Sequence, residues 1–377
     1  MRSLRRIAAL AAAGTIAAGT AAALAIAPAG AALASPGPSF IGQFHQLATI
    51  ASTVPPNGDV NPYGIVVLSQ SVGRLHAGDI LVSNFNDSAN EQGTGRTLVE
   101  ISPGGQRSVF ASISGPLPGA CPGGVGLSTA LAVLPGGWVV VGSTPSANGQ
   151  AATARAGCLI VLGPQGHVRE TIAGHGINGP WDATAVSSGS RSDLFVTNVL
   201  NGTVAAAGGV VHRGTVLRLT LSTAGGTPPQ LTNVVTIASG LAEQTNAAAF
   251  ILGPTGVGLS RDGTLYVADT DTSQVTAIPD AAFRHRSAGA GLLLSAGGAL
   301  AGPLGLAVAP GGDILTVNGD NGNIVEITPS GHQVATAQLD SSGSPAGAGA
   351  LFGLAVAPGG HGVYYVDDAV NTLRLLH

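Results

Sequence analysis

The chain has 377 residues, of which 9% are charged and 45% are hydrophobic, with 58 glycines and 23 prolines. This composition suits many short strands joined by tight turns and disfavours a mainly helical protein. All 15 basic residues are arginine and the formal net charge is −4, which excludes a Schiff-base or phosphate-loop lysine and argues against a nucleic-acid partner.

The first residues are typical of a secretory signal. Residues 1–6 contain three arginines, residues 7–31 form an apolar, alanine-rich run, and residues 32–34 give a small-x-small cleavage site. We therefore predict a signal peptide over residues 1–34, a single mature domain over residues 35–377, and a protein that is secreted or lies in the periplasm or cell envelope. An uncleaved membrane anchor is the alternative, because the apolar run is long enough to span a bilayer.

Six similar units follow along the mature chain. Each begins with a short strand of small and branched residues, and successive units start 48 to 74 residues apart, the shorter spacings setting the period. A period of 40–50 residues with four strands per unit is the signature of propeller blades. The aligned first strands start at Gly64, Ala130, Asp182, Gly256, Gly305 and Gly353. The sequence thus predicts an all-β fold, a six-bladed β-propeller with four-stranded antiparallel blades.

The last unit lacks a fourth strand of its own. Residues 44–52, near the start of the mature chain, resemble the fourth strands predicted over residues 167–174 and 233–240. We expect this N-terminal strand to become the outer strand of the sixth blade, which closes the ring and removes an exposed edge.

The two cysteines both belong to the second unit. Cys121 lies in the loop before its first strand and Cys158 opens its third strand, and in a propeller these two positions lie on the same face. We predict a disulfide between them in an oxidising compartment. Two unpaired, buried thiols are the alternative.

Two of the six units resemble NHL repeats. They are PTGVGLSRDGTLYVADTDTSQVTAI, residues 254–278, and PLGLAVAPGGDILTVNGDNGNIVEI, residues 303–327. The repeat pattern joins a Pro-x-Gly entry, a glycine turn, a strand ending in Ala-Asp and a turn to the third strand. The resemblance covers most of the mature chain as architecture, but it implies no single activity, because propellers serve both as enzymes and as binding scaffolds.

Long loops gather on one face, here called the upper face, where the first strand of each blade begins. They precede first strands or join second to third strands, and we expect the binding site among them. The insertions span residues 85–95, 114–127, 144–157, 199–213 and 241–253.

Asp182 stands where the other five first strands have Gly or Ala. At the mouth of the central channel its carboxyl group can bind a metal ion, act as a base or accept hydrogen bonds from backbone amides. Trp181 precedes it, and Tyr63 and Phe352 hold the equivalent positions in the first and sixth units. These three rings are predicted either to form an aromatic floor for an apolar or sugar ligand or to pack between blades.

Asn84, Asn198 and Asn318 end second strands near the same face. Beside Asp182 they can supply neutral oxygen ligands, and three or four such oxygens suit Ca²⁺. Ca²⁺ is therefore the expected cofactor if a metal ion binds in the channel.

Two classes of function remain open. The first is an exported, monomeric scaffold that binds a small molecule, polymer or protein through the upper face, with membrane contact only if the signal stays uncleaved. The second is a divalent-metal-dependent hydrolase or lyase like the lactonase type of six-bladed propeller. The channel Glu expected of that type is missing, because Glu100 and Glu326 lie in third strands and Glu170 in a fourth strand. No catalytic residue can be assigned.

Overall fold

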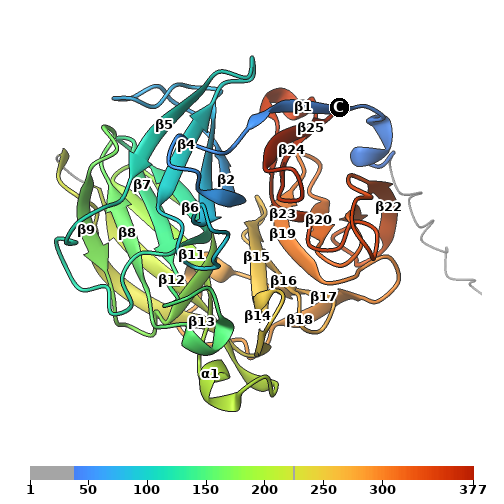
Figure 1. Cartoon of the computed structure of the whole chain (residues 1–377). Coiled ribbons are helices and arrows are strands. Elements are labelled where there is room, and N and C mark those ends of the chain that lie inside the picture. The colour runs from blue at the N-terminus through green and yellow to red at the C-terminus, as the bar shows by residue number, and fades with distance from the viewer. Residues whose placement is uncertain (1–37, 224–225) are drawn as a thin grey trace, which may run out of the picture. The chain divides into compact units, whose positions relative to one another are not determined.

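The computed structural model describes residues 38–223 and 226–377, and the predicted signal peptide lies outside them. Six antiparallel sheets follow one another as blades of a propeller (Figure 1). Blade 1 consists of β2 (Val60–Val67), β3 (Ile80–Asn86), β4 (Thr97–Ile101) and β5 (Arg107–Ser112). Blade 2 consists of β6 (Leu127–Leu134), β7 (Trp138–Ser143), β8 (Cys158–Leu162) and β9 (Val168–Ile172). Blade 3 consists of β10 (Gly179–Ser188), β11 (Arg191–Val199), β12 (Val211–Ser222), β13 (Gln230–Asn246) and β14 (Phe250–Leu252).

The second half of the chain repeats this arrangement. Blade 4 consists of β15 (Pro254–Leu259), β16 (Leu265–Asp269), β17 (Gln274–Ile278) and β18 (Leu292–Ala296). Blade 5 consists of β19 (Pro303–Val308), β20 (Ile314–Asn318), β21 (Asn323–Ile327) and β22 (Gln333–Gln338). Blade 6 consists of β23 (Leu351–Val356), β24 (Val363–Asp367), β25 (Thr372–Leu376) and β1 (Leu47–Ser52). The short helices are η1 (Ile41–Gln43), η2 (Ala151–Thr153), α1 (Thr203–Ala206), η4 (Ala281–Phe283) and η5 (Pro358–Gly360).

The N-terminal strand closes the ring, as the sequence predicts. β1 pairs antiparallel with β25, from Leu47 opposite Leu376 to Ser52 opposite Thr372, and the two ribbons lie side by side in Figure 1. Just before β1, the backbone N–H groups of Phe40 and Ile41 donate to the Glu326 carboxylate at 2.7 and 2.8 Å. The N-terminal segment is thus held by both blade 5 and blade 6.

Each pair of neighbouring blades shares one buried apolar cluster. Side chains alternate between the two faces of a strand, so Leu81 of β3 packs toward blade 2 while Ile80 and Val82 pack toward blade 6. The same division recurs at all six interfaces, including the one between blades 6 and 1. A closed ring of sheets therefore buries both faces of every blade.

Blades 4, 5 and 6 require glycine where their first strands crowd round the axis. A Cβ atom on Gly256 would lie 2.1 Å from the carbonyl oxygen of Leu304, and one on Gly305 would lie 2.2 Å from that of Phe352. Both distances are far shorter than a van der Waals contact. Gly353 is in the same position, so larger residues are excluded there and the channel walls start on bare backbone.

Blade 3 departs from the predicted pattern. Residues 241–253, expected to be a loop, contain the end of β13 and all of β14. β13 runs past the ordinary length of a fourth strand because it keeps pairing with β12 as far as Glu243 opposite Val211, and it then turns back to pair with β14. The insertion is therefore a strand extension that reaches the upper face.

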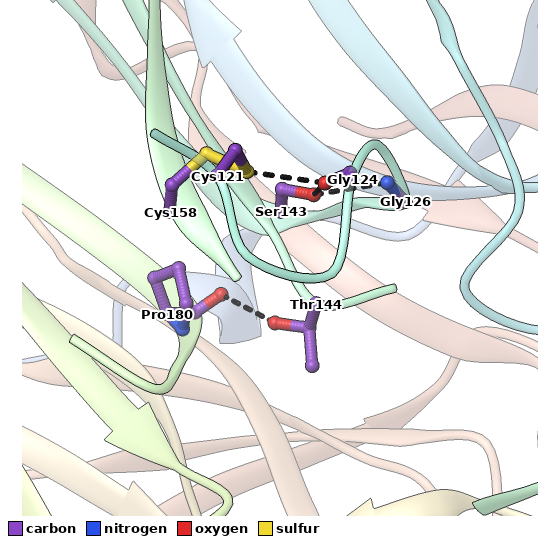
Figure 2. The surroundings of a disulfide bond; sticks show 7 residues. All are labelled: Cys121, Gly124, Gly126, Ser143, Thr144, Cys158 and Pro180. Carbon is purple, nitrogen blue, oxygen red and sulfur yellow. Dashed lines mark hydrogen bonds between the residues drawn. A yellow bond between two sulfur atoms is a disulfide. The ribbon is translucent and has the colours of Figure 1, made fainter. Parts of the chain in front are cut away.

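Cys121 and Cys158 form the predicted disulfide, with their Cα atoms 5.1 Å apart. Figure 2 shows that it ties the loop before β6 to the first residue of β8. Nearby, the Ser143 hydroxyl accepts from Gly126 N at 2.9 Å and donates to Gly124 O at 2.8 Å. This part of the upper face is therefore firmly fixed, and the disulfide agrees with an oxidising compartment. Among the described residues, no helix has the length and apolar character needed to cross a membrane.

Candidate functional site

The six first strands enclose a central channel of about 350 Å³. Its walls are formed mainly by glycine, alanine, valine and leucine from β2, β6, β10, β15, β19 and β23. Asp182 and Tyr63 are the titratable residues among the described residues that line it. The channel thus has walls of small and branched side chains and of backbone polar groups, and among the described residues Asp182 gives it a single carboxyl group.

The Asp182 carboxyl group accepts two backbone hydrogen bonds. Oδ1 accepts from Ala183 N at 2.8 Å, within β10, and Oδ2 accepts from Val257 N at 3.0 Å, across to β15. Burial raises the pKa of Asp182 to about 8, although both hydrogen bonds act in the opposite direction. The raised pKa favours the protonated form, whose O–H can act as a donor, and no other carboxyl group lines the cavity among the described residues.

The predicted aromatic residues do lie together, and two further rings join them. The Tyr63 ring lies 4.0 Å from Phe352 and 5.8 Å from Trp181, measured between centroids. Phe85 and Phe250 complete the cluster, at 5.6 and 6.3 Å from Trp181. Tyr63 and Trp181 are 3% and 1% exposed, whereas Phe352 is half-buried. The rings cover the upper end of the channel above Asp182, mostly by packing against one another.

Three upper-face loops interlock over this aromatic cluster. Gln92 Nε2 donates to Ala248 O at 3.0 Å, which joins blade 1 to blade 3. Ser146 N donates to Gly93 O at 3.0 Å, which joins blade 2 to blade 1. A Cβ atom on Gly93 would lie 3.4 Å from the Phe250 ring, so the loop rests closely on the cluster. The loops predicted to form a binding face are here engaged with one another.

The channel is more accessible at its opposite end, here called the lower end. Each first strand enters the channel at the upper face, where Tyr63, Trp181 and Thr255 are buried. The residues near the lower end of each first strand are partly exposed: Val67, Val133, Ala185, Leu259, Val308 and Val356. The channel wall is therefore partly open to solvent at the face with the shorter turns, while at the upper end Leu304 and Phe352 are also partly exposed.

The three predicted asparagine ligands are buried, at 0% exposure, but none of them lines the channel. Their amide groups fix neighbouring loops instead. The bonds run from Asn84 Nδ2 to Thr53 O at 3.1 Å, from Asn178 N to Asn198 Oδ1 at 2.8 Å, and from Asn318 Nδ2 to Ala299 O at 2.7 Å. The structure does not gather them round Asp182, so Ca²⁺ binding at Asp182 stays a prediction.

A second group of potential ligands lies at the lower end of blade 1. Ligand atoms of His76, Asp79 and Glu100 all lie within 4.8 Å of one another. This group was not predicted from the sequence because the three residues come from a loop, a strand edge and another strand. The available signal was that blades 1 and 5 share an Asp before the second strand and a Glu in the third, at Asp313 and Glu326 in blade 5.

Solved structures share this architecture. A gluconolactonase from Xanthomonas campestris is 14% identical, with a TM-score of 0.53 over 88% of each chain. Regucalcin from Agrobacterium tumefaciens, a calcium-binding protein, is also 14% identical, with a TM-score of 0.52 over 87% of this chain and 93% of that one. A luciferin-regenerating enzyme is 12% identical, with a TM-score of 0.51 over 88% of this chain and 95% of that one.

These identities are low enough that the likeness concerns the fold alone. No protein-family model matches the chain, and no curated protein matches its sequence. The resemblance to NHL repeats therefore stays a prediction. Together, the structure and its neighbours establish that this protein is a six-bladed β-propeller.

Proposed function

We propose that this protein is a binding protein that takes a slender, apolar small molecule into its central channel, with Asp182 holding a polar head group. The observation that supports this most directly is that Asp182 is the one carboxyl group among the described residues lining a cavity of about 350 Å³. Small-molecule sites typically occupy about 300–1,000 Å³ and combine apolar walls with a few well-placed polar groups. The channel volume lies at the small end of that range, and its walls combine small apolar side chains and backbone groups with the Asp182 carboxyl group.

The chemistry of Asp182 suggests the kind of head group. With its pKa raised to about 8 by burial, the carboxyl group keeps its proton at neutral pH. Its two oxygens already accept backbone N–H groups, so its O–H is best matched by an acceptor such as a ketone or alcohol oxygen. A carboxylate head group is disfavoured because it would leave water for a cavity whose described lining residues include no cationic side chain.

Access from the lower end supports a ligand that enters between the ends of the first strands. The upper end is covered by the aromatic cluster and by the interlocked loops of blades 1 to 3. The lower rim is formed by partly exposed valine, alanine and leucine side chains. An apolar chain that follows the head group would lie against these walls and would gain about 25 cal/mol per Å² of apolar surface removed from water.

The channel residues do not favour the metal-dependent alternative. Ca²⁺ takes about six to eight oxygen ligands, whereas the channel lining offers the Asp182 carboxyl group with no second carboxylate among the described residues. The Nδ2 groups of Asn84 and Asn318 donate to loop carbonyls, Asn198 Oδ1 accepts from Asn178 N, and none of the three asparagines lines the channel. We therefore propose no hydrolytic step, and Ca²⁺ binding that depends on Asp182 is the result that would favour a lactonase-like activity.

Calorimetric titration of the mature protein with 2-octanone and with octanoate at pH 7 tests the proposal. We expect 2-octanone to bind more tightly than octanoate, and Asp182→Leu to weaken 2-octanone binding at least about tenfold, the cost of one lost buried hydrogen bond. If wild type and Asp182→Leu bind 2-octanone equally well, Asp182 does not bind the head group and the proposal is rejected. Ca²⁺ binding that Asp182→Ala abolishes would support the metal-dependent alternative instead.

The direction of entry has its own pair of variants. Val308→Trp places a large ring at the lower rim and is expected to abolish 2-octanone binding. Ala147→Trp places the same ring on an exposed position of the upper-face loops and is expected to leave the binding unchanged. The reverse result would place the entrance on the upper face.

A further inference from the structure

We propose that His76, Asp79 and Glu100 form a binding site for a divalent transition-metal ion such as Zn²⁺ at the lower end of blade 1, separate from the channel. Zn²⁺ is commonly bound by an imidazole nitrogen together with carboxylate oxygens. Ca²⁺ and Mg²⁺ favour shells made of oxygen alone. One imidazole and two carboxylates, with ligand atoms within 4.8 Å of one another, therefore match Zn²⁺ in kind and in charge.

Glu100 is the buried centre of this group, with a side chain only 3% exposed. Its Oε1 atom accepts from the backbone N of His76 at 2.7 Å and lies 3.1 Å from His76 Nδ1. Among the described residues, no hydrogen bond reaches Oε2. Burial raises the pKa of Glu100, and the charge of Asp79 adds to the rise. A buried carboxylate that has a free oxygen and a second acid beside it gains from a bound cation.

Blade 5 contains the same pair of acids without the histidine. Asp313 and Glu326 occupy the positions of Asp79 and Glu100, and the Asp313 carboxyl group likewise raises the pKa of Glu326, after burial. In blade 5, however, both Glu326 oxygens accept backbone N–H groups from the N-terminal segment. That carboxylate is fully engaged by protein donors, whereas the one in blade 1 has an open oxygen and an imidazole facing it.

In blade 3 a basic residue occupies the position that Glu100 has in blade 1. The residue equivalent to Glu100 is Arg218, which is 3% exposed and donates from Nη1 to Ala281 O at 3.1 Å. The acid at the start of the neighbouring strand is Asp193, whose charge raises the pKa of Arg218 against the larger effect of burial. Among these three blades, only blade 1 places a metal-binding nitrogen next to two acids.

The loop that carries His76 is fixed before any ion binds. Leu75 is 1% exposed and packs in the core between blades 1 and 2. Arg74 N donates to Pro164 O at 2.8 Å, and the Arg74 guanidinium donates to Phe110 O at 3.1 Å. The His76 side chain itself is 69% exposed, so an ion can enter from solvent and keep water at its remaining positions.

The test is a titration of the mature, untagged protein with ZnCl₂, followed by calorimetry, with Co²⁺ absorption as a second readout. We expect one Zn²⁺ per chain, at least tenfold weaker binding in both His76→Ala and Asp79→Asn, and loss of the Co²⁺ ligand-field bands in both. The matched control is His167→Ala, which removes another exposed histidine and is expected to change neither readout.

Two results would overturn the proposal. One is an absence of Zn²⁺ binding, which would leave His76 and Glu100 as an ion pair alone. The other is binding of unchanged affinity in His76→Ala, which would place the ion elsewhere. Asp182→Leu separates this proposal from the function of the channel, because it is expected to lose 2-octanone binding and to keep Zn²⁺ binding.

Discussion

Asp182 occupies a position at which the equivalent glycines of blades 4, 5 and 6 leave no room for a side chain. At Gly256 and Gly305 a Cβ atom would strike the backbone of the next first strand. In blade 3 the carboxyl group reaches the next strand and accepts a hydrogen bond from Val257 N. A residue that breaks the local rule of small side chains, and is then held by two backbone donors in the channel, is expected to serve binding rather than stability.

The protonation of Asp182 makes a prediction about stability. Its folded pKa is raised from 3.8 to about 8, so between these values the unfolded chain loses a proton that the folded chain keeps. The free energy of unfolding therefore falls as the pH rises from about 4 to about 8, by at most roughly 5 kcal/mol at 1.36 kcal/mol per pKa unit.

Urea denaturation at pH 5 and pH 8 measures this effect. Asp182→Asn cannot ionise, so the fall between the two pH values is expected to be smaller in the variant than in wild type by up to several kcal/mol. Other buried acids, such as Glu243 and Asp269, titrate in both proteins and cancel in the comparison. An identical fall in both proteins would mean that Asp182 is ionised in the folded state at pH 7.

At the level of elements, the disulfide and the Glu326 carboxylate stabilise segments that are not part of the repeated blade structure. The disulfide binds the loop before β6 to β8 across 37 residues of sequence, and the Glu326 carboxylate binds the segment before β1 to blade 5. Each is expected to raise the free energy of unfolding by holding a loop segment that lies outside the blade strands.

The Cys121→Ser/Cys158→Ser variant is expected to lose about 3–4 kcal/mol of unfolding free energy, from the loop-closure entropy of a 37-residue separation. Urea denaturation with and without a reducing agent measures this difference. The free energy of unfolding of the wild type is expected to fall when the reducing agent is added, while that of the double variant is expected to stay the same. A reductant effect of equal size in both would assign the loss to another cause.

Glu326→Gln is expected to cost about 1–3 kcal/mol, because a neutral amide offers one acceptor oxygen to two backbone donors. Hydrogen exchange should speed up at the amides of Phe40 and Ile41 before it changes in the blade cores. Glu170→Gln, which alters a partly exposed carboxyl group on β9, is the control. Unchanged exchange at both amides would show that Glu326 is not what holds this segment.

For the molecule as a whole, the sequence predicted the repeated blades and the features that depend on residues close together in the chain. The six units, the four-stranded blades and the disulfide follow from spacing, and the closing role of residues 44–52 follows from a strand missing at the other end. The contents of the site depend on contacts between distant residues. Nothing in the sequence places Phe250 on Trp181, or His76 over Glu100, because those pairs meet only after several blades or a whole loop are in place.

The asparagines are a second example of what could not be predicted from the sequence. Asn84, Asn198 and Asn318 were predicted to lie at the ends of second strands near the upper face, and they end those strands or lie close to their ends. The direction of each side chain depends on which loop carbonyl or amide is within reach, and the spacing of residues carries no information about that. Position along a strand was therefore predictable, and the partner of the side chain was not.

The pairing of β1 with β25 also determines the order in which the protein can be completed. β1 is among the first strands to be synthesised, yet its partner is made more than 300 residues later. Until then β1 has no partner strand and the apolar interface between blades 6 and 1 has only one side. Ring closure is therefore a late, long-range step that should limit the folding rate.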